Sequence, residues 1–169
     1  MNVAEVNTLS QQAYMEAFGP IAEHSPWVAE SAGAAAPFAD RQAMIDAFQK
    51  ALTAAEEADQ LAVIRAHPDL AGRAALAGEL EAHSTSEQSR AGLDQLTQEE
   101  LDHFTDLNGR YLEKFGFPFI FAVKGATKYQ ILDAFEARIG ATKTEEFLTA
   151  ITQVCRIIRF RLEDMVDEL

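Results

Sequence analysis

His67 is the side chain of this sequence best suited to proton transfer. It precedes Pro68 where an apolar helical pattern ends. An imidazole changes charge between about pH 5 and 8, so it can give or take a proton at neutral pH. A histidine at the C-terminal end of a helix can also simply bond the last carbonyls or interact with the helix dipole. The position therefore permits acid–base catalysis without requiring it.

Glu87 is a second candidate for a functional side chain. Ser84 precedes it by three residues, and this spacing is typical of a capping box at the start of a helix. The carboxylate would then lie beside N–H groups that point outward. Such groups can bind an anion while the carboxylate accepts bonds from an N–H-rich ligand. A structural role and a ligand-binding role both stay open for Glu87.

A metal site is a third possibility, with His83, Glu87 and His103 as ligands. His83 and Glu87 are four residues apart, so they would share a face if both were helical. A helix that starts at Ser84 would break this arrangement, and the sequence contains no HExxH pattern. The single cysteine, Cys155, excludes a cluster of thiolate ligands. We therefore expect no metal.

The arginines near the C-terminus differ in their angular position on the last expected helix. At about 100° per residue, Arg156 and Arg159 lie well off its apolar stripe, whereas Arg161 lies roughly 55° from the centre. A buried guanidinium needs an anionic partner. That partner can be a structural Asp or Glu, or the carboxylate of a substrate. The stripe itself is Phe147, Ile151, Val154, Ile158, Leu162, Met165 and Leu169.

The segment 114–125, with the sequence KFGFPFIFAVKG, is the longest apolar run in the chain. Its phenylalanines alternate with period two, and Gly116 and Pro118 disfavour a helix between them. No second strand is apparent for it to pair with. A buried, extended backbone must find other partners for its N–H and C=O groups. Some of these groups are therefore candidates for contacts with a ligand.

The elements that would position these residues are helices. We expect one all-α domain over residues 1–169, a bundle of about seven to nine helices with one extended segment near 115–124. Pro26 suits a first helical turn, with Trp27 as a core anchor. Asp40 is expected to cap one helix, and Ser84, Thr97, Thr127 and Thr142 are expected to open four others. The expected helices span 8–18, 41–55, 56–65, 84–93, 97–114, 127–140 and 142 to near the C-terminus, with short helical pieces and loop over 69–83.

Composition narrows the class of protein. The 169 residues carry a net charge of −13, which argues against a nucleic-acid-binding protein. A small anionic substrate is still compatible, because the local field of a pocket can oppose the net charge. The first twenty residues lack the pattern of a signal peptide, and no apolar run is long enough for a membrane span. We therefore expect a cytoplasmic protein without a membrane or nucleic-acid partner.

Four motifs, taken together in order and spacing, resemble the OHCU decarboxylase family. Each motif is weak alone, but the resemblance covers nearly the whole chain, from the Trp27 segment to the last helix. Members act on 2-oxo-4-hydroxy-4-carboxy-5-ureidoimidazoline in the last step of urate breakdown to (S)-allantoin. The motifs are His67-Pro68-Asp69-Leu70-Ala71-Gly72, Ser84-x-x-Glu87-Gln88-x-x-Ala91-Gly92-Leu93, Leu107-Asn108-x-x-Tyr111 before KFGFPFIFAVKG, and Arg161-Leu162.

The resemblance implies an all-α, cofactor-independent carboxy-lyase, commonly a homodimer, and it implies roles for particular residues. His67, Glu87 and Arg161 match catalytic positions, and the match of Arg161 depends on a short motif. The chain lacks the peroxisomal C-terminus of plant and animal members, which favours a bacterial type. Eleven positions match substrate-binding stretches: Pro68, Ser84, Thr85, Ser86, Glu87, Gln88, Phe119, Ile120, Phe121, Ala122 and Val123.

Two other classes of function stay open at this point. A non-catalytic helical interaction module would tolerate changes at His67 and Glu87 without loss of turnover. A metal-dependent hydrolase using His83, Glu87 and His103 would lose its activity with a chelator. The decarboxylase hypothesis predicts that changes at His67 and Glu87 lower turnover and that a chelator has no effect. The reason is that the substrate supplies its own electron sink, so the protein only has to orient the substrate and move a proton.

Overall fold

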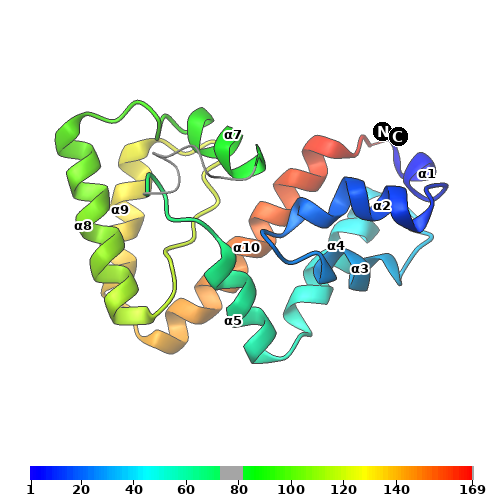
Figure 1. Cartoon of the computed structure of the whole chain (residues 1–169), viewed down its shortest axis with the longest axis horizontal. Helices are drawn as coiled ribbons and strands as arrows, with labels where there is room; N and C mark the ends of the chain where they lie inside the picture. Colours follow the sequence, from blue (N-terminus) through cyan, green and yellow to red (C-terminus); the bar gives the residue numbers. More distant parts are fainter. Residues whose placement is uncertain (73–81, 169) are drawn as a thin grey trace. The chain divides into compact units, whose positions relative to one another are not determined.

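The computed structural model describes residues 1–72 and 82–168, and their secondary structure is helical (Figure 1). β structure in this part of the chain is limited to one parallel bridge, between Asn2 and Asp167. The all-α class is therefore confirmed. No helix within the described ranges is both long and apolar enough to cross a membrane. The contacts divide the chain into two compact units: unit 1 comprises Met1–Ala66 and Val154–Leu169, and unit 2 comprises His67–Gln153.

Unit 1 is built from short helices and the C-terminal part of a long one. The apolar face of α4 supplies much of its core, since Met44, Ile45, Phe48 and Leu52 are at most 1% exposed. The Asp40 side chain caps α4 by accepting a bond from the Ala43 amide at 2.7 Å. The elements are α1 (Val3–Val6), α2 (Gln11–Phe18), the 3-10 turn η1 (Gly19–Ile21), α3 (Trp27–Gly33), α4 (Arg41–Thr53), α5 (Glu57–Ala66) and the end of α10 (Lys143–Met165).

Three details of unit 1 differ from the expectation. The first predicted helix begins at Gln11 rather than residue 8, because the Ser10 side chain caps it through the Ala13 amide. The short helix α1 was not predicted, although Asn2 and Glu5 form a capping box there. Trp27 is only half-buried, so it is not a core anchor. The small residues Val28, Ala29 and Ala32 are the buried side of α3 instead.

The two chain ends are bonded to each other within unit 1. The Asp167 amide donates to the Met1 carbonyl at 2.8 Å, and Figure 1 draws the two termini side by side. The Arg41 side chain donates to the Val166 carbonyl at 3.0 Å and pairs with Glu168 at 2.6 Å. These contacts hold the last described residues against α4. Leu169, the last member of the predicted apolar stripe, lies outside the described residues.

In its described residues, 67–72 and 82–153, unit 2 contains the loop after α5, three further helices and the start of α10. The threonine caps were predicted correctly: the hydroxyls of Thr97, Thr127 and Thr142 each accept a bond at 3.2 Å from the amide three residues on. α8 ends at Gly116, whose φ of 75° is the left-handed conformation that glycine tolerates. The elements are α7 (Ala82–Arg90), α8 (Gln98–Phe115), α9 (Lys128–Ile139) and the first part of α10.

The expected capping box at Ser84 is wrong. Helix α7 includes Ala82, so Ser84 is a helical residue rather than a cap. Ser84 and Gln88 are four apart and are 4% and 6% exposed, so they form the buried side of α7. The Ser-x-x-Glu signature is local, whereas the burial of this polar face depends on the rest of unit 2. The predicted helical pieces and loop over 69–83 lie largely outside the described residues.

An aromatic cluster forms the core of unit 2. The centroid of the Tyr111 ring on α8 lies 4.5 to 6.0 Å from the ring centroids of Phe115, Phe117, Phe119 and Phe135. Helices α8 and α9 pack together around it (Figure 1). The extended segment expected near 115–124 is non-helical over 117–123, as predicted, whereas Phe115 is the last residue of α8. Its phenylalanine side chains therefore serve as its anchors.

Candidate active site

The loop that carries His67 begins directly after α5. His67 is 7% exposed, and the loop behind it is held through its main chain by two helices. On α7, the Gln88 side chain accepts a bond from the Ala71 amide at 2.9 Å and donates to the Asp69 carbonyl at 3.2 Å. On α8, Asn108 donates to the Leu70 carbonyl at 2.9 Å. The loop is thus fixed by side-chain amides.

Two backbone features make this loop sensitive to substitution. Ala71 has a φ of +50°, an uncommon conformation for a residue other than glycine. A Cβ atom built on Gly72 would lie 2.4 Å from the Cβ of Asp69, which is closer than real contacts allow. Burial also raises the pKa of the Asp69 carboxyl. The turn is therefore compact, and its partners are specific.

Gly72→Ala is expected to destabilise unit 2 by about 1–3 kcal/mol, because the new methyl group overlaps a Cβ rather than a mobile chain end. Gly109→Ala is the matched control. Gly109 is exposed on α8 with nothing within 4 Å of an added Cβ, so this change should stabilise the protein by up to about 1 kcal/mol. Urea unfolding of both variants measures the difference. Equal stability of the two variants would contradict the described turn.

The predicted residues of α7 divide between its two sides. Ser84 and Gln88 are buried, Thr85 and Ser86 are exposed, and Glu87 is half-buried between them. Because the helix already includes residue 82, the Glu87 carboxylate is not the second half of a cap at Ser84. One structural explanation for Glu87 is thereby removed, while its predicted contact with a ligand stays a prediction.

The same helix start changes the geometry of the possible metal ligands. His83 and Glu87 are now four apart within α7, which the expected cap would have prevented. His103, on α8, instead lies 3.1 Å from the Glu136 carboxylate of α9. Over residues 1–72 and 82–168, no group of three or more His, Cys, Asp or Glu side chains could hold a metal ion.

The segment 119–123 is held on both its side chains and its main chain. The Phe119 ring stacks on Phe135 at 3.8 Å between centroids. Arg138 donates to the Ile120 carbonyl at 2.6 Å, and Gln153 accepts from the Ala122 amide at 2.9 Å. Arg138 and Gln153 were not among the residues predicted from the sequence to take part in the site. Nothing in the sequence indicated such a role, since Arg138 has the position of an ordinary dipole partner in the last turn of α9.

Arg161 belongs to unit 1, where it is 3% exposed, as its angular position predicted. It donates to the Ile21 carbonyl at 2.9 Å and lies 3.4 Å from the Glu23 carboxylate, which is also buried. The structural partner that the sequence left open therefore exists. Arg156 is exposed and Arg159 is half-buried, in agreement with their position off the stripe.

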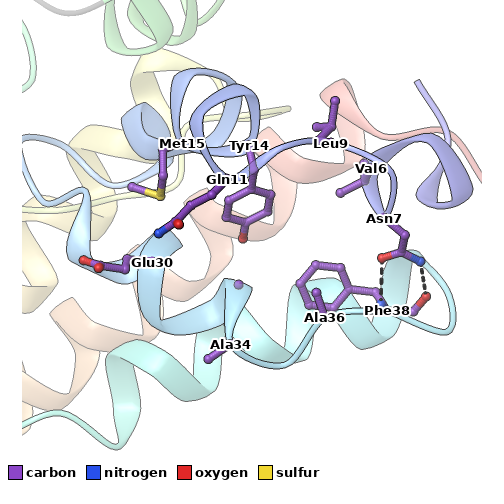
Figure 2. Close-up of a pocket in the computed structure, with 11 residues that line it drawn as sticks. Val6, Asn7, Leu9, Gln11, Tyr14, Met15, Glu30, Ala34, Ala36 and Phe38 are labelled. Atoms are coloured by element: carbon purple, nitrogen blue, oxygen red, sulfur yellow. Dashed lines mark hydrogen bonds between the residues drawn. The ribbon is translucent and has the colours of Figure 1, made fainter.

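A separate cavity of about 350 Å³ lies in unit 1 and contains none of the predicted site residues. Figure 2 shows Tyr14 pointing into it from α2, with Phe38 beyond. Asn7 closes one end by exchanging two hydrogen bonds of 2.8 Å with the main chain of Phe38. The lining is mainly apolar, and Gln11 and Glu30 add polar groups to those of Asn7 and Tyr14.

Comparison with known proteins identifies the class to which this fold and these residues belong. The family model described as OHCU decarboxylase matches residues 7–163. Relatives that carry the name 2-oxo-4-hydroxy-4-carboxy-5-ureidoimidazoline decarboxylase include proteins from Haloferax volcanii and Mus musculus. The relative from Haloferax volcanii is 38% identical over 97% of this chain and 95% of its own. The relative from Mus musculus is 31% identical over 98% and 93%.

Solved structures agree with this assignment. A crystal structure of (S)-allantoin synthase superposes with a TM-score of 0.79 and 29% identity, covering 99% of this chain and 55% of that one. An OHCU decarboxylase crystallised in the presence of (S)-allantoin has the same fold, with a TM-score of 0.72 and 22% identity over 89% of this chain and 96% of that one. The chain belongs to the OHCU decarboxylase family.

Proposed function

We propose that this chain is a carboxy-lyase that converts 2-oxo-4-hydroxy-4-carboxy-5-ureidoimidazoline to (S)-allantoin in urate degradation. Its membership of the family, with relatives of that name matched over nearly their whole length, supports the reaction. The observation that carries the proposal is the buried His67 on a loop fixed by Gln88 and Asn108. The family model runs through both units, which supports our proposal that residues 1–169 act as one domain.

The substrate's own chemistry explains why the protein can work by positioning. A carboxylate and a hydroxyl share one ring carbon, next to the C=N bond of the imidazoline. When the C–CO₂ bond breaks, its electron pair forms a C=C bond to the ureido-bearing carbon, and the π electrons of the C=N bond move to the ring nitrogen. That nitrogen takes a proton from solvent, which leaves a neutral enol. The enol then loses its O–H proton, and the ureido-bearing carbon gains one, which gives the ring carbonyl and the stereocentre of (S)-allantoin. The protein has to orient the carboxylate and control on which face that proton arrives.

We assign the proton transfer to His67. As a neutral imidazole it would take the proton of the ring hydroxyl, and as an imidazolium it would deliver a proton to the ureido-bearing carbon. Pro68 follows it and restricts the main chain at this point. A proton donor fixed on one side of the ring would explain a single product enantiomer.

We assign ligand binding to residues 84–88 of α7 and to the segment 119–123. Glu87 would accept bonds from the ureido N–H groups, with Ser84, Thr85 and Ser86 on the same helix. The Gln88 carboxamide already bonds the His67 loop through both its oxygen and its nitrogen. We therefore propose that Gln88 acts mainly by holding that loop. Main-chain groups of Phe119, Ile120, Phe121, Ala122 and Val123 would supply the remaining polar contacts.

Arg161 is proposed to bind an anionic or carbonyl group of the ligand, and its pair with Glu23 allows a test. Arg161→Gln should raise KM by about 10–100-fold if it binds the ligand, the typical loss for a hydrogen bond to a charged group. Glu23→Gln removes the same ion pair but not the guanidinium, so its KM should change little. If both variants lose only stability and keep KM, the role of Arg161 is structural.

The reaction itself is tested optically. Urate is converted in situ by the two upstream enzymes, and circular dichroism follows the appearance of (S)-allantoin with and without this protein. The protein should accelerate the signal and give one enantiomer. A racemic product at the same rate in both samples would rule out the function. A chelator in a parallel sample should leave the rate unchanged, whereas a metal-dependent hydrolase would lose its activity.

Two further predictions concern the protein in solution and the cell. The family resemblance predicts a homodimer, which analytical ultracentrifugation measures directly. The sequence predicts a cytoplasmic location, which fractionation of the source cells tests.

A further inference from the structure

A buried group of charged and polar side chains in unit 2 lies outside the residues assigned to the reaction. Its centre is Glu146 on α10, which is 1% exposed. Glu146 accepts a bond from the Tyr111 hydroxyl at 2.6 Å and another from Arg138 Nε at 2.5 Å. The Arg138 guanidinium also lies over the Phe119 ring, 4.3 Å from its centroid. A buried ion pair adds little net stability, because the cost of desolvating the two charges offsets their attraction. Stability alone therefore does not explain this group.

Arg138 links this group to the main chain of the segment 119–123. Its Nη1 donates to the Ile120 carbonyl at 2.6 Å. The peptide bond from Ile120 to Phe121 is trans, since the cis bond found in the described chain is Ala36–Pro37. In a trans peptide the C=O and N–H point in opposite directions. By fixing the Ile120 carbonyl, Arg138 therefore turns the Phe121 amide away from itself.

Gln153 fixes the next peptide in the same way. Its Oε1 accepts the Ala122 amide at 2.9 Å, so the Phe121 carbonyl points away from Gln153. Both main-chain groups of Phe121 are thus directed away from their anchors on α9 and α10. Within the described part of unit 2, neither group forms a hydrogen bond with the protein. Phe121 therefore presents one donor and one acceptor.

We propose that Arg138, Glu146 and Gln153 are positioning residues that hold the two peptides on either side of Phe121 in the orientation needed to bind the substrate. The matching ligand chemistry is a carbonyl next to an N–H, as in a ureido group. Tyr111 completes the group by fixing Glu146, which in turn orients the guanidinium. This inference rests on the proposed function for the identity of the ligand, but the orientation of the peptides does not depend on it.

Gln153 offers a matched pair of variants to test this role. Gln153→Glu keeps an acceptor oxygen for the Ala122 amide, and its kcat should stay within about 3-fold of the wild type. Gln153→Leu removes the acceptor, and its kcat should fall at least about 10-fold, the worth of one hydrogen bond. Arg138→Met should have an effect at least as large. Arg110→Met is the control for loss of an arginine, since Arg110 is exposed and its ion pair among the described residues is with Asp106, one helical turn away.

Hydrogen exchange of the ligand-free protein separates positioning from general stability. In Arg138→Met and Gln153→Leu, the amide within residues 119–123 that is protected by a hydrogen bond, that of Ala122, should exchange at least about 10-fold faster, while the interior of α8 keeps its wild-type rate. Faster exchange throughout unit 2, or unchanged exchange at 119–123, would overturn the proposal. So would a wild-type kcat in both variants. If the wild-type protein produced no (S)-allantoin, the proposed function would fail, and the exchange data would still decide whether these residues fix the segment.

Discussion

Replacing His67 with glutamine is expected to lower the turnover number by about 10²–10⁴-fold, the usual contribution of one proton-transfer group. Glutamine keeps a polar side chain of similar length but cannot change its charge near neutral pH. Because His67 is buried at 7% exposure, a polar replacement is needed so that the loop does not collapse. The rate is measured by circular dichroism with freshly generated substrate, and folding is checked by urea unfolding.

His103→Gln is the matched control for this experiment. His103 is an exposed histidine of the same unit that pairs with Glu136, so its replacement should leave the decarboxylation rate unchanged. The two variants also separate the rival functions. A metal-dependent hydrolase would need His103, whereas the decarboxylase does not. Near-full turnover of His67→Gln would show that the assignment of His67 is wrong.

Replacing Phe119 with alanine is expected to lower the free energy of unfolding by about 3–5 kcal/mol. Phe119 is 1% exposed, and its ring stacks on Phe135 and lies 5.4 Å from Tyr111. Removing the ring would therefore leave a cavity at the centre of the aromatic cluster. It would also remove the surface on which the Arg138 guanidinium rests.

Phe121→Ala provides the comparison for this result. The Phe121 ring stacks on Phe119 at 6.2 Å but is only half-buried, so its loss should cost about 1–2 kcal/mol. Urea unfolding measures the free energy of unfolding of both variants. The two values can be compared if the dependence of that free energy on urea concentration has the same slope. Equal losses for the two variants would mean that burial does not distinguish the two rings. Any loss of activity in Phe119→Ala is expected to follow from displacement of the main chain.

The start of α7 and the surroundings of Trp27 show where local signals failed. Ser84 and Glu87 have the spacing of a capping box, yet α7 begins before Ser84, and Ser84 and Gln88 lie on its buried side. Trp27 is a large aromatic residue of a kind that often anchors a core, yet the smaller side chains of α3 occupy the buried side of that helix. At Ser84, tertiary packing outweighed a capping preference worth about 1 kcal/mol.

The sequence by itself determined the features that depend on neighbours along the chain. Period and capping residues predicted the helical class, the threonine caps and the non-helical segment after Gly116. The angular position of Arg161 predicted its burial. Only the tertiary structure decided which partners these groups have. The pairs of Arg161 with Glu23, Gln88 with Ala71, Arg138 with Ile120 and Gln153 with Ala122 join positions that are 138, 17, 18 and 31 residues apart. Hydrogen bonds are short and directional, so no periodicity along the chain can specify them.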